Sequence, residues 1–208
     1  FLCGYPRTCG LYSKPIPSGT KKIIYAPTFR WSQYLENCMV DDLIKSLSLI
    51  QKTMEAIDGK FIIRFHPHTW RDYNYKLTAE IKKYRRIKID KTDDVYAEMP
   101  NYFAMISDYS SIVYDFLLMN RPLVFHCPDL KFYMHADHDL KYDYKEVSPG
   151  PQTKSWEETM KAIAEYAENP EKDSDERLRV RDFFYDMSVN DENNCERIVE
   201  EVKRRINF

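Results

Sequence analysis

Apolar, β-rich runs alternate along the chain with segments in which apolar residues recur at helical spacing. The β-rich runs predict strands at residues 21–27, 60–67, 86–90, 102–107 and 122–127. The helical segments are 39–57, 73–86, 93–99, 110–119, 155–168, 173–185 and 192–206. Because strands that alternate with helices form a parallel sheet covered on both faces, the pattern predicts a Rossmann-like α/β fold.

Two local patterns predict how segments begin and end. Apolar residues recur at helical spacing from Met39 to Ile57, and Gly59 is expected to close that helix. The first residues, Phe1 to Arg7, look like a strand that runs straight into a turn. A chain that starts inside such a run, and with Phe1, is expected to be a piece of a longer protein.

The size of the chain fits one domain. It has 208 residues, of which 43% are hydrophobic and 31% charged, which is enough for one full-sized domain with its own core. We therefore expect residues 1–208 to form a single domain that ends in a helix at 192–206.

Charge and cysteine content exclude some protein classes. The formal net charge of −2 argues against a general nucleic-acid binder. The five cysteines are odd in number and form no CxxC pair, so we expect reduced cytosolic thiols and not a disulfide framework. The sequence shows no signal peptide and no apolar run long enough to span a membrane. These features predict a cytoplasmic protein.

Polar side chains follow the predicted strands at the points where those strands end. Thr28 and Arg30 follow the first strand, Arg64 and His66 stand at the end of the second, and SDYSS (107–111) begins at the end of the fourth. Ligands of open parallel sheets bind at the carboxyl ends of the strands, so we expect these side chains to share one site.

Ser110 and Ser111 stand between a predicted strand and a predicted helix. Ser110 or Asp108 could serve only as the N-cap of that helix, because Ser and Asp are favoured caps. Alternatively, the free N–H groups of the helix start and the two hydroxyls could bind a phosphate, without any Gly-rich loop. Asp115 lies within the apolar helix and should face a ligand hydroxyl or a basic side chain, because an unpaired buried carboxylate is costly.

His66 lies at the end of the second predicted strand, two residues after Arg64 and on the same face. A lone histidine is more often structural, but this position favours joint phosphate contact with Arg64 and proton donation by His66. Thr28 and Arg30 also fit anion binding, although any surface loop can carry such residues.

Two charged stretches are more ambiguous. The basic run of Lys82, Lys83, Arg85 and Arg86 fits a solvated helix face, or contact with an anionic membrane surface or a polyanionic acceptor. A second stretch contains His126, Asp129, His135, Asp137, His138 and Asp139. Its HADHD (135–139) spacing lies in a loop and matches no helical metal motif, so we expect neither a metal nor a cofactor.

Five segments together carry a resemblance to a known family. They are GYPR (4–7), IIYAPTFR (23–30), IRFHP (63–67), SDYSSIVYDFLLMNRPLVFHCPDL (107–130) and YDYKEVSPGP (142–151). They resemble the CDP-glycerol glycerophosphotransferases, which are teichoic-acid and capsule polymerases and primases with a GT-B fold. The resemblance extends from Gly4 to about Phe184, and DYSSIVYDFLL followed by PGP is its most specific part.

The resemblance implies a CDP-alcohol site with the diphosphate at the two serines. The family pattern falls on Arg7, Pro27, Thr28, Arg64, Phe65, His66, Ser110, Ser111 and Asp115. It implies that His66 is catalytic and, with Arg64 and the serines, stabilises negative charge on the phosphates. Arg30, Asp108 and Gly150 are further candidates for this site.

The sequence departs from the family at its start. The family takes its general base from a Trp-His-Gly-Thr-Pro segment upstream of GYPR, and this sequence has no such segment. TCGLY (8–12) stands where the family has Asn and then Asp, and 189–202 matches the family's ending only loosely. The chain thus resembles the C-terminal, nucleotide-binding half of a GT-B enzyme. The acceptor domain would lie in a missing N-terminal part, so the fragment alone is expected to be inactive.

The implied activity is transfer of a polyol phosphate. An acceptor hydroxyl would attack the β-phosphorus of CDP-glycerol or a similar CDP-polyol, and CMP would leave. The acceptor would be lipid-linked or a polysaccharide, in teichoic-acid or capsule synthesis, which leaves room for peripheral contact with the inner face of the cell membrane. Two alternatives stay open: a GT-B glycosyltransferase that uses a nucleotide sugar, and a nucleotide-binding module that is inert without its partner domain.

Overall fold

The computed structural model describes residues 3–12, 14–136 and 141–206, and these contain a six-stranded parallel sheet. The strand order is β3-β2-β1-β4-β5-β6. The strands are β1 (Lys21–Tyr25), β2 (Gly59–Ile63), β3 (Ile87–Ile89), β4 (Ala104–Ser107), β5 (Leu123–His126) and β6 (Gln152–Thr153). Ile24 of β1 pairs with Ile62 on one side and with Met105 on the other. The predicted Rossmann-like α/β fold is confirmed.

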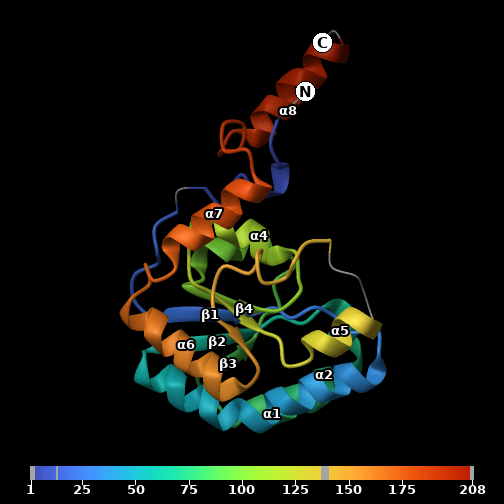
Figure 1. The fold of residues 1–208 in the computed structure, drawn as a ribbon, viewed down its shortest axis with the longest axis vertical. Coiled ribbons are helices and arrows are strands. Elements are labelled where there is room, and N and C mark those ends of the chain that lie inside the picture. The colour runs from blue at the N-terminus through green and yellow to red at the C-terminus, as the bar shows by residue number, and fades with distance from the viewer. Residues whose placement is uncertain (1–2, 13, 137–140, 207–208) are drawn as a thin grey trace.

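Helices cover both faces of this sheet (Figure 1). On one face lie α1 (Gln33–Ala56), α2 (Pro67–Ile81) and α6 (Trp156–Glu168). On the other lie α3 (Val95–Glu98), η2 (Met99–Asn101), α4 (Ile112–Phe116), η3 (Leu117–Met119) and α7 (Ser174–Phe184). The short helix α5 (Leu130–Ala136) follows β5. The last helix, α8 (Asn194–Ile206), points away from the sheet, and the N-terminal segment with η1 (Pro6–Thr8) lies at its base.

The two faces of the sheet carry two separate apolar cores, because successive strand residues point to opposite sides. Ile23 and Tyr25 of β1 belong to the core shared with α1, α2 and α6. Ile24, between them, belongs to the core shared with α4 and α7. Each of these three side chains is at most 1% exposed. The sheet is therefore buried on both faces, as its near-continuous apolar strands predict.

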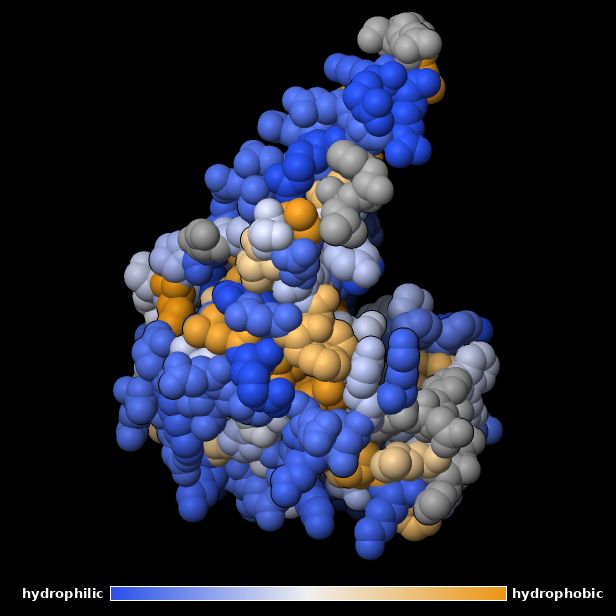
Figure 2. Space-filling view, turned by 45° about the horizontal axis from the view of Figure 1, so that its top comes forward, coloured by the Kyte–Doolittle hydropathy of each residue, from blue (hydrophilic) through white to orange (hydrophobic). Residues whose placement is uncertain are grey.

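The surface is mainly polar. Figure 2 shows hydrophilic residues over the projecting C-terminal helix, and hydrophobic residues that reach the surface of the body beneath it. Among the described residues, no helix is both long enough and apolar enough to cross a membrane.

Several predicted boundaries are wrong. Helix α1 begins at Gln33, after the Ser32 cap, and not at residue 39. Strand β2 ends at Ile63, and Pro67 is the first residue of α2, a position that proline favours. The residue with left-handed backbone after α1 is Asp58 (φ 48°), and Gly59 opens β2, so the predicted closing role of Gly59 is wrong.

The structure also contains elements that the periodicity does not predict. Residues 3–5 form no strand and lead directly into η1. Helix α5 and strand β6 were not expected, and β6 has only 2 residues, too few to show a period. The final helix begins at Asn194, close to the expected position.

Candidate functional site

Three loops meet at the carboxyl edge of the sheet, after β1, β2 and β4. Strand β1 lies between β2 and β4, so the order of the strands reverses there, which is where open α/β sheets bind ligands. The Thr28 N–H donates to Oδ1 of Asp108 (2.8 Å), which joins the loops after β1 and β4. The Phe29 ring lies 5.6 Å from the His66 ring, which joins the loops after β1 and β2. The structure thus brings together Thr28, His66 and the SDYSS segment.

The two serines are not used as side-chain caps. Ser111 is the N-cap residue of α4, but its side chain makes no capping hydrogen bond. Within the described part of the chain, neither the Ser110 hydroxyl nor the Ser111 hydroxyl has a hydrogen-bond partner, and Ser111 is exposed. Local helix capping therefore does not explain them, and both hydroxyls are available to a ligand.

Thr28 provides a third hydroxyl without a partner. Its Oγ1 is buried and makes no hydrogen bond to the residues that the structure describes. A buried hydroxyl left in this state is unfavourable by about 1–3 kcal/mol. This is the state expected of a group that a bound ligand or water would satisfy. The preceding Pro27 is buried.

His66 is held as a neutral donor that faces outwards. It caps α2, and its Nδ1 accepts a hydrogen bond from the His68 N–H (3.3 Å). Because Nδ1 is the acceptor, we assign the proton of the neutral ring to Nε2. Burial lowers the pKa of His66, and the neighbouring His68 lowers it further. At neutral pH the exposed His66 can therefore donate from Nε2 to an anionic oxygen.

The side chains of Arg64 and Phe65 contact other protein residues instead of the open edge of the site. The Arg64 Nη1 donates to Oδ2 of Asp90 (2.6 Å) and to Thr92. Phe65 packs against the ring of Tyr25 in the core beneath the loop. Since β2 ends at Ile63, the alternation expected to place Arg64 and His66 on one face does not extend to them.

Asp115 faces a basic side chain, which is one of its two expected partners. Arg7 donates to Oδ2 from Nε (3.1 Å) and to Oδ1 from Nη2 (3.3 Å). The hydroxyls of Tyr96 and Tyr185 donate to the same carboxylate, one to each oxygen. These four bonds fill the acceptor capacity of a carboxylate that is 2% exposed, whereas the Arg7 side chain is 52% exposed. Asp115 thus fixes Arg7 at the edge of the domain.

Arg30 is a buried residue that links several loops, and not a surface residue. Its side chain is 2% exposed and forms ion pairs with Asp108 (2.7 Å) and Asp129 (2.7 Å). Its Nη1 also donates to the Thr28 carbonyl (2.6 Å). Burial alone would lower the pKa of Arg30, but the two aspartates outweigh burial and raise it. Arg30 therefore stays charged and holds the loops after β1, β4 and β5 together.

Sequence reasoning missed most of the Arg30 network. The sequence predicts Asp108 to be a helix cap or a ligand contact, but its Oδ1 accepts backbone hydrogen bonds from Thr28 and Tyr109. The sequence places Asp129 only among candidate metal ligands, but its carboxylate accepts hydrogen bonds from Arg30 and from the Tyr109 hydroxyl. The signal that could have located Asp129 is the CPDL segment (127–130), which stands at the end of the fifth predicted strand.

Gly150 lies apart from this site. It is next to Leu123, the first residue of β5, and so at the opposite, amino edge of the sheet. A Cβ atom on Gly150 would lie 2.3 Å from the Leu123 carbonyl oxygen. The close backbone approach is enough to require glycine there.

The histidine- and aspartate-rich stretch is only partly described. His126 is buried, its Nδ1 lies 2.9 Å from the Thr159 hydroxyl, and burial lowers its pKa to about 4. Asp137, His138 and Asp139 lie outside the described residues, as does the side chain of His135. Among the described residues, no three His, Cys, Asp or Glu side chains are grouped as metal ligands.

The predicted basic run lies on the surface. Lys83 forms an ion pair with Glu80, Arg85 with Glu55, and Arg86 with Asp58. These contacts are what a solvated face would show.

Two cavities flank the loops. One of about 240 Å³ is lined by both serines together with Tyr114, Tyr142 and Phe184. A larger one of about 700 Å³ lies on the α1 side, between Tyr34, Met39, His126 and Phe132, and includes Arg30. The smaller cavity places aromatic rings beside the free hydroxyls.

Comparison with known proteins gives one consistent result. A family model described as "CDP-Glycerol:Poly(glycerophosphate) glycerophosphotransferase" matches residues 2–204. The chain is 31% identical over 150 residues to a teichoic acid poly(glycerol phosphate) polymerase of Bacillus subtilis, covering 71% of the chain and 19% of that protein. It is 28% identical over 167 residues to a teichoic acid ribitol-phosphate primase of Bacillus spizizenii, covering 73% of the chain and 40% of the primase.

A solved structure is similar over almost the whole chain. It is that of the wall teichoic acid polymerase TagF, H444N variant soaked with CDPG, with a TM-score of 0.69 and 25% identity. The match covers 99% of this chain and 50% of that one. The chain thus spans half the length of that structure, and less than half of each curated relative described above.

Proposed function

Because the chain belongs to the CDP-glycerol:poly(glycerophosphate) glycerophosphotransferase family, we propose that it is the donor-binding part of a polyol-phosphate transferase. It would form a single nucleotide-binding domain, the C-terminal half of a GT-B enzyme. The donor would be CDP-glycerol or a similar CDP-polyol. The acceptor hydroxyl would belong to a lipid-linked or polysaccharide chain of teichoic-acid type, and the enzyme would work in the cytoplasm, at the inner face of the membrane.

The observation that carries this proposal is the group of unused donors at the switch point of the sheet. Thr28, Ser110 and Ser111 offer hydroxyls that the described chain does not engage. His66 offers Nε2 beside them. Neutral hydrogen-bond donors at fixed positions suit the oxygens of a diphosphate. They stabilise the negative charge of the bound diphosphate without transferring a proton to it.

Each of these side chains would have a role in the proposed reaction. The acceptor oxygen attacks the β-phosphorus, and its proton would pass to a general base outside these 208 residues. The bond from that phosphorus to the bridging oxygen breaks, and CMP leaves with that oxygen. The serines and Thr28 would bind the diphosphate, and His66 would donate to the oxygen that gains charge. Arg7, oriented by Asp115, would present its remaining Nη1 to the donor.

Calorimetric titration of the 208-residue chain tests donor binding. We expect CDP and CDP-glycerol to bind more tightly than UDP-GlcNAc. Ser111→Ala should remove a hydrogen bond to a charged group and weaken CDP binding by about 1.5–3 kcal/mol, or roughly tenfold to hundredfold. Its melting temperature should hardly change, because Ser111 makes no capping bond. Ser48→Ala, at an exposed position in α1, is the matched control and should leave CDP affinity unchanged.

Three results would count against the proposal. Equal or tighter binding of UDP-GlcNAc would favour a nucleotide-sugar glycosyltransferase. Unchanged CDP affinity in Ser111→Ala would remove the serines from the site. In the full-length enzyme, His66→Gln should lower kcat far more than it changes KM, and near-normal kcat would exclude the catalytic role of His66.

A further inference from the structure

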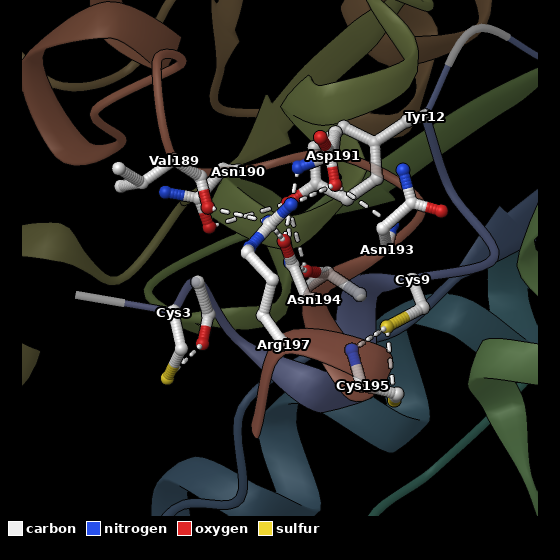
Figure 3. Close-up of polar contacts among 12 residues, drawn as sticks. Cys3, Cys9, Tyr12, Val189, Asn190, Asp191, Asn193, Asn194, Cys195 and Arg197 are labelled. Carbon is white, nitrogen blue, oxygen red and sulfur yellow. Dashed lines mark hydrogen bonds and ion pairs between the residues drawn. The ribbon is translucent and has the colours of Figure 1, made fainter. Parts of the chain in front are cut away.

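Two cysteines that lie far apart in sequence meet at the base of α8. The Sγ atoms of Cys9 and Cys195 are 3.0 Å apart, although 186 positions separate them along the chain (Figure 3). Both are free thiols; Cys195 is exposed and Cys9 is half-buried. Cys9 directly follows η1, and Cys195 lies in the first turn of α8. A bond between them would join the two ends of the described chain.

Surrounding polar contacts hold the two segments in place. Asn194 is buried and donates from Nδ2 to the Tyr5 carbonyl oxygen (3.0 Å) and to the Tyr12 hydroxyl (3.2 Å). Arg197 donates to Oδ1 of Asp191 (2.7 Å), which ties the first turn of α8 to the preceding loop. Figure 3 shows these polar contacts beside the two sulfurs. Such positioning favours an intramolecular reaction over reaction with another molecule.

The surroundings also decide which thiol reacts first. The Cys195 N–H, at the positive end of α8, donates to the Cys9 sulfur (3.2 Å). A thiolate is stabilised at a helix N-terminus. Because this N–H points at the Cys9 sulfur, it favours the thiolate of Cys9, and Cys9 is the first nucleophile.

We propose that Cys9 and Cys195 form a redox-responsive modification site, which a small-molecule disulfide converts into an intramolecular disulfide. The Cys9 thiolate attacks one sulfur of the small disulfide, and one small thiolate leaves. The Cys195 thiolate then attacks the Cys9 sulfur, and the second small thiolate leaves. The two protons lost by the cysteines pass to the two released thiolates, and two equivalents of small thiol reverse the reaction.

The bond would restrict the separation of η1 from α8. Arg7 is in η1, two residues before Cys9, so the cross-link would also limit movement of the segment that carries Arg7. In the unfolded chain, the same bond would close a loop of nearly the whole length, which removes conformational freedom from that state. The oxidised protein should therefore resist thermal unfolding better than the reduced one.

The test uses the whole 208-residue chain in buffers with graded ratios of oxidised to reduced glutathione. After alkylation of the remaining thiols, mass spectrometry should show three alkyl groups on the five cysteines. The mass should be about 2 Da below that of a reduced chain that carries three alkyl groups, because the disulfide removes two hydrogens. Tryptic peptides 8–21 and 182–197 should be joined. The melting temperature should rise on the order of 5 °C upon oxidation.

Matched variants assign these effects. Cys9→Ser and Cys195→Ser should each lose both the joined peptides and the rise in melting temperature. Cys38→Ser, which removes an exposed thiol in α1, should keep both. The proposal is overturned if both cysteines stay alkylatable in oxidised glutathione, if Cys9 keeps a bound glutathione without pairing, or if Cys9 pairs with Cys3 or with another molecule. No readout uses a nucleotide, so failure here leaves the proposed donor site untouched, and the reverse is also true.

Discussion

Replacing Arg30 with methionine would leave two aspartates without their counter-charge. The Arg30 side chain is 2% exposed, and its partners Asp108 and Asp129 are 1% and 17% exposed. Methionine keeps an unbranched chain in the same space but donates no hydrogen bond. The variant therefore removes the charge while it disturbs the packing as little as the chain allows.

The expected loss of stability is large. Removing one partner from a buried ion pair costs about 3–5 kcal/mol, because the other charge stays buried and unpaired. Domains are stable by only about 5–15 kcal/mol in total. Arg71→Met is the matched control, because Arg71 forms an ion pair with Asp72 in which both side chains are well exposed. An exposed pair of this kind contributes about 0–1 kcal/mol.

The loss should also depend on pH, and its sign can be worked out from Asp129. Burial acts to raise the pKa of Asp129, but Arg30 and the other hydrogen-bond donors outweigh burial and lower it. In the parent, this carboxylate thus adds stability above the unfolded pKa of about 3.9, and the contribution is lost as pH falls through the lower folded pKa. Without Arg30, burial should raise the pKa of Asp129 above 3.9. As the solution becomes acidic, protonation of Asp129 then removes the buried negative charge and reduces the stability loss of the variant.

Urea unfolding followed by tryptophan fluorescence measures both effects, at about pH 7 and about pH 5. The difference in unfolding free energy between the parent and Arg30→Met should be smaller at the lower pH. Arg30→Met/Asp108→Asn should recover part of the lost stability, because one of the unpaired charges is gone. A cost no larger than that of Arg71→Met, or a difference that grows on acidification, would refute the reasoning.

The remaining predictions concern single groups. Gly150→Ala should destabilise the chain by roughly 1–3 kcal/mol in urea unfolding, because the new Cβ would meet the Leu123 carbonyl oxygen, while Gly10→Ala, with open space around it, should have little effect. Burial lowers the pKa of His126 to about 4, so its contribution to stability is full above the unfolded value of about 6.5 and is lost as pH falls towards 4. This loss should reach roughly 3 kcal/mol and be absent in His126→Gln, as unfolding curves over this pH range would show. Asp115→Asn should cost only about 1.5–3 kcal/mol of stability, because its arginine partner is half-exposed and can be rehydrated, but it should weaken CDP binding in calorimetry.

The sheet and its layers could be predicted from the sequence because their signal is periodic. Strands such as β4 and β5 are buried throughout, are apolar except for their last residues, and have turn signals nearby, so their positions in the chain are predictable. The ends of the helices carry a weaker signal. Helix α2 buries only Thr69, Leu77 and Ile81, and the one buried residue in its first turn is a threonine, so the periodicity predicts a later start than the structure shows.

That Thr28, His66 and the SDYSS segment lie at one edge could also be predicted, because the carboxyl ends of parallel strands share that edge. How each side chain is used could not. Arg30 has the same sequence surroundings as a surface arginine, and its partner Asp129 lies 99 positions away. Gly150 belongs to a segment typical of the family, but its place is fixed by contact with Leu123 at the other edge. Such contacts depend on how the chain folds, and they produce no periodic pattern in the sequence.

The polar groups around the switch point therefore divide into two kinds, and this division has a thermodynamic consequence. Arg30 and Asp108 use their hydrogen-bonding capacity on the protein, so their loss should lower stability first and affinity only through the loops that they hold. Ser110 and Ser111 make no side-chain hydrogen bond within the described chain, so their loss should lower affinity and leave stability unchanged. The change in CDP affinity of each variant can be plotted against its change in unfolding free energy. If the serines were structural, Ser111→Ala would, like Arg30→Met, mainly lose unfolding free energy. Because Ser111 has no hydrogen-bond partner in the described chain to lose, Ser111→Ala should change mainly the CDP affinity, whereas Arg30→Met should change mainly the unfolding free energy.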